Sequence, residues 1–217
     1  MLKLAPLMHP GSRCTILCLG AHCDDIEIGC GGTLLKLVEE GHELTFHWVV
    51  ASSNPRRESE CRRSAERFLA GAAHANVVTW QFRDGYFPYI GAEVKDAFER
   101  LKKEISPDII FTHYRDDLHQ DHRTISSLTW NTFRDHLILE YEIPKYDGDF
   151  SSPNLYVPLT EEQCGRKTAH LMACYESQKS HRWFTEDTFR SMLRLRGVEV
   201  GSPSGYAEGF YARKTMW

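Results

Sequence analysis

Two short clusters of histidine and aspartate in this sequence have the composition of a metal-binding or catalytic site. The first is His22-Cys-Asp-Asp25, where a histidine and a carboxylate three residues apart can face one ion. The second runs from His113 to His122 and holds three histidines and three aspartates in ten residues. Imidazole and carboxylate groups at this density are costly if buried without partners, which favours a functional site over a polar turn.

The adjacent aspartates Asp24 and Asp25 are suited to different tasks because their side chains diverge. One carboxylate can bind Zn²⁺ through a mixed set of nitrogen and oxygen ligands, while the other stays free to accept a proton from water on the metal. The alternative is that both carboxylates only cap the following helix. The second cluster favours the metal, since two histidines and one carboxylate with an open position are typical of catalytic zinc.

Both clusters follow short apolar segments that are typical of strands buried on both faces. These predicted strands cover residues 15–20 and 108–113. The carboxyl ends of parallel strands lie at one edge of an α/β sheet, and ligands bind there. The two clusters are therefore predicted to converge on one site.

Strand and helix patterns alternate through the first half of the chain. Further strands are predicted at residues 43–51 and 76–82, with amphipathic helices around Leu34, Ala65 and Phe98. Later helices are predicted at 123–139, 161–175 and 186–196, with mostly loop at 141–159 and a strand or loop at 205–214. The pattern predicts one α/β domain over 1–217, with a Rossmann-like, mostly parallel sheet flanked by helices. The order of the later strands stays open.

Composition and charge exclude several classes of protein. The chain has 217 residues, 41% hydrophobic and 26% charged, which fits one globular domain. Its 26 basic against 30 acidic residues give a net charge of −4, so no global positive field attracts nucleic acid. No apolar run is long enough for a membrane span, and Pro6 and Pro10 interrupt the N-terminal segment before it could act as a signal peptide. We expect a cytoplasmic protein whose seven cysteines are mostly reduced core residues.

The two clusters, in this order, resemble the LmbE-like, or PIG-L, family of zinc-dependent N-deacetylases. Ala21-His-Cys-Asp-Asp25 is similar to the family's A-H-P-D-D motif, and Gly31-Gly-Thr-Leu34 is similar to the helix start that follows it. His119-Gln-Asp-His122 is similar to its H-x-D-H motif. Weaker similarities are the Arg-rich segment RRESECRRSAE, Tyr175-Glu-Ser-Gln178 and Tyr206-Ala-Glu208. The resemblance spans nearly the whole chain.

This resemblance implies zinc-dependent hydrolysis of an N-acetyl amide, commonly on a glucosamine unit. The residues that it carries over are His22, Asp25 and His122 as metal ligands, Asp24 as general base and His119 beside the scissile carbonyl. Asp121 is expected to orient an imidazole. Arg56 and Arg57 follow a strand at the same sheet edge, so one of them is a candidate to bind a substrate hydroxyl or phosphate, the alternative being a solvated helix start; Arg56 and Gln178 are taken as the candidate substrate-binding residues. A thiol conjugate, a nucleotide sugar or an antibiotic intermediate fits as substrate, and a glycolipid fits least. The family often forms homo-oligomers.

Some positions depart from the family pattern or allow a second role. Cys23 and Gln120 stand where the family commonly has proline, which frees φ and adds an N–H donor in each loop. His113 is an alternative metal ligand to His119 or His122. Aromatic residues between Trp80 and Tyr89 fit either a sugar-stacking wall or a core edge.

Two other classes of function remain open. Glycines at Gly29, Gly31 and Gly32 near a helix start suggest a dinucleotide-binding oxidoreductase, although the G-x-G-x-x-G spacing is absent and two aspartates precede them. A catalytically silent metal-binding scaffold would keep the same fold. Metal content separates the deacetylase from the oxidoreductase, and turnover separates it from the scaffold.

Overall fold

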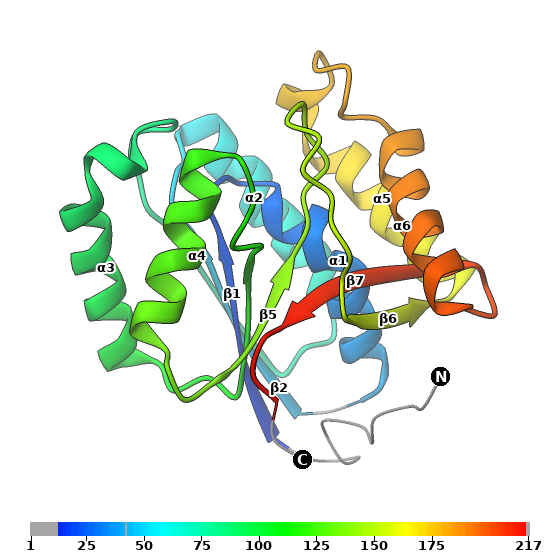
Figure 1. Ribbon diagram of the computed structural model, residues 1–217, viewed down its shortest axis with the longest axis horizontal. Coiled ribbons are helices and arrows are strands. Elements are labelled where there is room, and N and C mark those ends of the chain that lie inside the picture. The colour runs from blue at the N-terminus through cyan, green and yellow to red at the C-terminus, as the bar shows by residue number, and fades with distance from the viewer. Residues whose placement is uncertain (1–12, 42, 216–217) are drawn as a thin grey trace.

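A seven-stranded sheet in the order β3-β2-β1-β4-β5-β7-β6 forms the centre of the protein (Figure 1). The computed structural model describes residues 13–41 and 43–215. Strands β1 to β5 are parallel, whereas β7 runs antiparallel to both β5 and β6. The strands are β1 (Arg13–Gly20), β2 (Glu43–Val50), β3 (His74–Thr79), β4 (Ile109–His113), β5 (Leu137–Tyr141), β6 (Leu155–Leu159) and β7 (Tyr206–Ala212). This architecture confirms the predicted Rossmann-like, mostly parallel α/β fold.

Helices cover both faces of the sheet (Figure 1). On one face lie α1 (Asp25–Glu39), α2 (Pro55–Phe68), α5 (Glu161–Cys174) and α6 (Glu186–Val200), and on the other lie α3 (Gly91–Glu104) and α4 (Gln120–Thr132). Short 3₁₀ turns, η1 (Phe87–Tyr89) and η2 (Glu176–Gln178), complete the elements that the structure describes. Each face encloses its own hydrophobic core.

Strand β1 contributes side chains to both cores, which explains its uninterrupted apolar sequence. Ile16 and Cys18 pack in the core under α1, whereas Leu17 and Leu19 pack in the core under α3 and α4. A strand buried on both faces has no polar side to show alternation. Its apolar run ends at Gly20, so the polar residues that follow lie at the sheet's carboxyl edge.

The predicted helix over residues 123–139 is wrong at both ends. Helix α4 begins at Gln120 and ends at Thr132, and residues Leu137–Tyr141 form β5 instead. Ile138 and Leu139 are buried and face opposite cores, so the short apolar run carries no period that distinguishes a strand from a buried helix. The early start of α4 places His119 at its N-cap.

Other segments refine the prediction. The segment 141–159, predicted as mostly loop, contains β6, and residues 205–214 contain β7, which pairs with both β5 and β6.

All seven cysteines are free and buried, as predicted. The prediction about Pro6 and Pro10 falls outside the described residues. Within the described ranges no helix has the length and apolarity to cross a membrane.

Candidate metal and catalytic site

The two polar clusters meet at the carboxyl edge of the sheet, because β1 and β4 are neighbours there. His22 Nδ1 lies 3.2 Å from His122 Nε2 and 3.4 Å from Asp25 Oδ2. His122 Nε2 lies 3.6 Å from Asp25 Oδ1. Ligand atoms around a tetrahedral zinc, with bonds of about 2.0–2.1 Å, are about 3.4 Å apart. The three side chains that the sequence proposes as ligands thus lie close together, and the side-chain groups that could hold a metal here are His22, His119 and His122; Asp25, His113 and His122; and His22, Asp84 and Asp121.

Each of the two histidines is oriented by a carboxylate on its other ring nitrogen. His122 Nδ1 donates to Asp117 Oδ2 at 3.0 Å, and His22 Nε2 lies 3.3 Å from Asp121 Oδ2. Such outer carboxylates fix the tautomer of a metal-binding imidazole and leave its second nitrogen free for the ion. Burial raises the pKa of Asp117, but the hydrogen bond from His122 and the nearby cationic groups outweigh it, so the pKa lies well below its usual value.

Asp121 and Asp117 differ in how well the sequence identifies them. Asp121 Oδ2 lies 3.3 Å from His22 Nε2, and the carboxylate also accepts the backbone N–H groups of Gly85 at 2.6 Å and Phe87 at 3.1 Å, while its expected role in orienting an imidazole stays a prediction. Asp117 was missed, although it belongs to the same cluster as His122. Only the density of histidines and aspartates in that cluster could have pointed to Asp117, because no motif spacing links Asp117 to His122.

Asp24 is a buried carboxylate with one oxygen held and one oxygen free. Its Oδ1 accepts a hydrogen bond from Arg57 Nη2 at 2.7 Å, whereas its Oδ2 has no hydrogen-bond partner among the described residues. Burial raises the pKa of Asp24, and the Arg57 guanidinium only partly opposes this shift. Asp24 occupies the N-cap position of α1 but makes no capping hydrogen bond, so capping does not account for its side chain. A free buried oxygen beside a metal site suits a general base.

His119 presents a donor nitrogen at the same site. As N-cap of α4 its Nδ1 accepts the backbone N–H of Asp121 at 3.3 Å, so the proton of the neutral ring resides on Nε2. Burial, with the neighbouring His22, lowers the pKa of His119 and favours that neutral ring. Its ring stacks on His122 with centroids 4.4 Å apart. This arrangement can donate a hydrogen bond to an oxyanion.

His113 and Cys23, the alternative ligands, have other partners. His113 Nε2 accepts the backbone N–H of Ala21 at 2.9 Å, and its ring stacks on His122 at 4.0 Å. Although His113 Nε2 also lies 3.1 Å from Asp25, the backbone donor already occupies that nitrogen's lone pair. The Cys23 thiol contacts the carbonyl of Ser52 at 3.5 Å. The Nε2 of His113 and the Cys23 thiol are thus engaged elsewhere, but His113 still belongs, with Asp25 and His122, to a group that could hold a metal ion, so the choice of ligands stays a prediction.

The two candidate substrate-binding residues lie differently from what the sequence suggested. The Arg56 side chain is 67% exposed, and Gln178 is half-buried and donates to Ser177 at 3.1 Å. Arg57, rather than Arg56, reaches Asp24. Arg57 lies four residues before the buried Cys61, so the two residues share one face of the helix. This spacing could have identified Arg57 instead of Arg56 from the sequence. A role of Arg56 and Gln178 in substrate binding stays a prediction.

The glycines that suggested a dinucleotide site lie inside α1 and serve close packing. A Cβ atom at Gly29 would lie 2.2 Å from the Tyr141 ring, and one at Gly32 would lie 2.4 Å from Leu159. At Gly31 the same atom would lie 2.6 Å from Phe68. The glycines thus bring α1 close to its neighbours, so the pattern that suggested a phosphate loop has a packing explanation.

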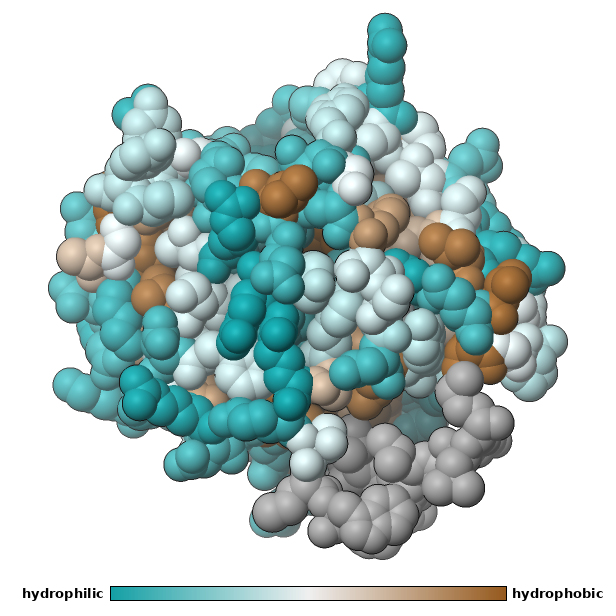
Figure 2. All heavy atoms as spheres, in the orientation of Figure 1, coloured by the Kyte–Doolittle hydropathy of each residue, from teal (hydrophilic) through white to brown (hydrophobic). Residues whose placement is uncertain are grey.

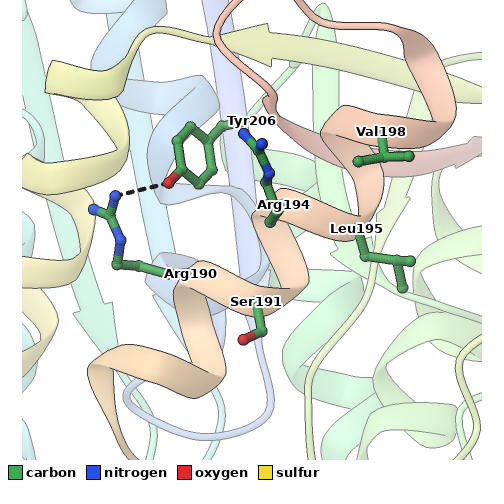
Figure 3. A pocket seen from close by; sticks show the side chains of 6 residues that line it. All are labelled: Arg190, Ser191, Arg194, Leu195, Val198 and Tyr206. Carbon is green, nitrogen blue, oxygen red and sulfur yellow. Dashed lines mark hydrogen bonds between the residues drawn. The ribbon is translucent and has the colours of Figure 1, made fainter.

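A separate open cavity of about 520 Å³ lies on the outer face of α6 (Figure 3). The residues that line it are Arg190, Ser191, Arg194, Leu195, Val198 and Tyr206. Arg190 donates to the Tyr206 hydroxyl at 2.8 Å, as the dashed line in Figure 3 shows. Figure 2 shows apolar side chains over α6 at the right of an otherwise mostly hydrophilic face. None of the predicted site residues lines this cavity.

The chain is similar to several known proteins. Residues 17–133, just over half of the chain, match the family model described as PIG-L: GlcNAc-PI de-N-acetylase. The uncharacterized deacetylase YaiS of Escherichia coli (strain K12) is 29% identical over 182 residues, which cover 79% of this chain and 96% of YaiS.

Two solved structures share the fold at low sequence identity. The N,N'-diacetylchitobiose deacetylase of Pyrococcus horikoshii is 23% identical, with a TM-score of 0.64 over 90% of this chain and 82% of its own. GalB, a 4-carboxy-2-hydroxymuconate hydratase from Pseudomonas putida KT2440, is 17% identical, with a TM-score of 0.69 over 94% and 97%. At these identities the likeness concerns the fold alone.

Proposed function

We propose that this chain, which belongs to the PIG-L family, is a zinc-dependent hydrolase that removes the acetyl group from an N-acetylated amino sugar. The observation that carries the proposal is the convergence of His22, Asp25 and His122, at 3.2–3.6 Å from one another, beside the free oxygen of Asp24. If a metal were bound there, a water molecule on it would give the buried, unpartnered Oδ2 of Asp24 a proton to accept. The donor set of two imidazoles and a carboxylate is one that zinc prefers in catalytic sites.

A zinc ion held by these three side chains would lower the pKa of a coordinated water to about 7 and polarise the substrate carbonyl. Asp24 Oδ2 accepts the proton of the attacking water as its oxygen bonds to the carbonyl carbon. His119 Nε2 donates a hydrogen bond to the carbonyl oxygen as negative charge develops there. The C–N bond then breaks, Asp24 returns the proton to the leaving amine, and acetate and the free amino sugar are released.

The substrate class is supported by the relatives and by the surroundings of the site. The family model and two of the similar proteins are described as deacetylases, one of them acting on diacetylchitobiose. In this chain Asp84 Oδ1 lies 3.0 Å from His22 Nε2, and Tyr86 beside it is 40% exposed. An exposed aromatic ring and a carboxylate at the edge of the site suit the faces and hydroxyls of a sugar.

The proposal is tested by acetate release from the zinc-loaded protein. The panel contains N,N'-diacetylchitobiose, an N-acetylated nucleotide sugar, a thiol conjugate, an antibiotic intermediate and a glycolipid. We expect release from at least one amino sugar, abolished by a chelator and restored by added zinc. A His122→Ala protein should bind less than a tenth of the wild-type zinc and show no release, because it lacks one ligand.

Four outcomes would contradict the proposal. Full release in the chelated sample would remove the metal from the mechanism, and stoichiometric zinc in His122→Ala would remove that residue from the ligand set. Tightly bound zinc with no release from any N-acetyl compound would favour a silent scaffold. Hydration of an unsaturated dicarboxylate by the same sample would instead favour the chemistry of GalB, the hydratase with this fold.

A further inference from the structure

We infer that Arg57, held by Glu60 and Ser177, is the positioning residue that fixes Asp24 for proton transfer. The inference rests on the proposed function, because it takes Asp24 as the base. It concerns a part of the site that the metal-binding residues do not reach. The three residues come from α2 and from η2, two elements separated by more than a hundred residues of chain.

Arg57 joins the base to two further side chains through its planar guanidinium. Its Nη2 donates to Asp24 Oδ1 at 2.7 Å, and its Nη1 donates to Ser177 Oγ at 3.1 Å and to Glu60 Oε2 at 3.4 Å. Only 14% of the Arg57 side chain is exposed. A buried guanidinium needs several acceptors at once, and these three supply them.

Glu60 and Ser177 are in turn fixed to each other. Glu60 is 4% exposed, and its Oε1 accepts the backbone N–H of Ser177 at 2.9 Å. The Ser177 hydroxyl donates to Glu60 Oε2. The two residues thus form a rigid acceptor pair, and Arg57 has one place in which all its partners are within reach.

The backbone that carries the base is fastened to the same assembly. The Tyr175 hydroxyl hydrogen-bonds to the carbonyl of Cys23, the residue before Asp24. The Arg57 guanidinium lies 5.2 Å from the centroid of the Tyr175 ring. Both the main chain and the side chain of the base are therefore tied to the segment from Tyr175 to Ser177.

The two carboxylate oxygens of Asp24 therefore have different roles. Arg57 holds Oδ1, which fixes the rotation of the carboxylate and leaves Oδ2 as the acceptor. An arginine is required because its fork can reach Asp24 with one arm and Ser177 with the other, whereas a lysine offers a single nitrogen. Misplacing a catalytic group by about 1 Å can cost about 10²-fold in rate.

The test compares Arg57→Lys and Arg57→Ala with wild type, and Arg62→Ala serves as the control. Arg62 is a half-exposed arginine of the same helix that contacts Glu58. We expect kcat to fall about 10²-fold in Arg57→Ala and by about 10-fold or more in Arg57→Lys, with KM and zinc content unchanged. Added guanidinium should restore part of the kcat of Arg57→Ala, which a purely structural role would not produce. The control should match wild type.

If Arg57→Ala does not fold, a second variant and a crystal structure can still test the inference. Ser177→Ala removes one acceptor of Arg57 and should lower kcat several-fold at constant KM. A crystal structure of zinc-loaded Arg57→Lys should show the Asp24 carboxylate rotated away from its wild-type orientation.

The outcomes separate this inference from the proposed function. Active wild type with an unchanged kcat in Arg57→Lys, or an unrotated Asp24 in its crystal structure, would overturn the positioning role alone. A raised KM with an unchanged kcat would overturn it as well and make Arg57 a substrate-binding residue. Inactive wild type on every amide would count against the proposed function, while the orientation of Asp24 in the crystal would still decide whether Arg57 positions it.

Discussion

Buried titratable groups lie against helix α1 at its N-terminal end and at its middle, and the hydrogen-bonding capacity of the two regions is satisfied to different degrees. In the middle, Glu208 accepts the backbone N–H groups of Gly32 at 2.8 Å and Thr33 at 2.6 Å and pairs with Lys167 at 2.6 Å. Lys167 also donates to the carbonyl of Ile28. At the N-terminal end, Asp24 Oδ2 and His113 Nδ1 have no partner among the described residues.

The difference distinguishes a structural charge pair from a functional one. A fully partnered buried pair stabilises a single packing arrangement, and breaking it is costly. A buried polar atom without a partner costs stability in the resting protein and requires another explanation. The unpartnered atoms at one end of α1 are consistent with the proposed site, whereas the paired groups at the middle join α1 to α5 and β7.

The largest effect should come from Asp24→Asn at the N-terminal end. We expect kcat to fall by about 10²–10⁴-fold, since an amide cannot accept the proton, while zinc content stays at the wild-type level. The free energy of unfolding should change little, because the substitution removes a buried charge but also removes the anion that pairs with the Arg57 guanidinium, to which the amide oxygen can still accept a hydrogen bond. Steady-state kinetics with metal analysis and urea unfolding check this result. A kcat close to wild type would remove Asp24 as the base.

The middle of the helix should respond in the opposite way. Lys167→Met leaves the Glu208 carboxylate without its cation and should lower the free energy of unfolding by about 3 kcal/mol. The kcat of the folded protein should change little. Urea unfolding measures the effect, with Lys179→Met, which alters an exposed pair with Glu176, as control. A large loss of kcat at unchanged stability would erase the distinction between the two regions.

Asp117→Asn should give a smaller effect on metal binding, together with the loss of the ion pair that Asp117 makes with Lys145 at 3.0 Å. Removing the carboxylate that accepts from His122 Nδ1 should weaken zinc binding about 10–100-fold, because the imidazole loses its orientation and basicity. A competition titration with a zinc chelator measures this change, and the exposed Asp116→Asn provides the matched control. Equal zinc affinity in both variants would contradict the orienting role.

The smallest effect is expected from Asp84→Asn. Asp84 and Asp121 both lie near His22 Nε2, but the Asp84 side chain is 73% exposed and Asp121 is buried and fixed by two backbone N–H groups. Exposed charges contribute little to orientation, so zinc affinity should change less than about 3-fold. A change comparable to that of Asp121→Asn, measured in the same titration, would make the two carboxylates equal partners of His22.

Sequence patterns predicted the parallel half of the fold well because β1, β2 and β4 are apolar runs separated by strongly amphipathic helices. The boundary between α4 and β5 could not be predicted, since Ile138 and Leu139 are buried on both faces and carry no period. Pairing of β7 between β5 and β6 depends on contacts between residues at least 47 positions apart in the chain. No local pattern encodes such a partner choice.

For the site, the motifs predicted that residues of two separate loops would meet, but they did not identify the residues that hydrogen-bond to them. His22, Asp25 and His122 lie at the distances that the proposed zinc site needs. Asp117 and Arg57 act through side-chain directions that depend on the folded backbone. The choice between Arg56 and Arg57 shows this limit, because neighbouring residues of one helix point about 100° apart and only the buried face identifies the right one.

The closely packed glycines of α1 (Gly29, Gly31 and Gly32) also limit where this protein can be altered by design. Any side chain added at Gly29 would press on Tyr141, whose hydroxyl donates to the carbonyl of Leu19, three residues before His22. Enlarging α1 there would displace the end of β1 and, with it, the proposed ligand His22. Efforts to broaden substrate range should therefore leave α1 untouched and vary the exposed aromatic residues of the 83–90 loop, where new side chains find room in solvent.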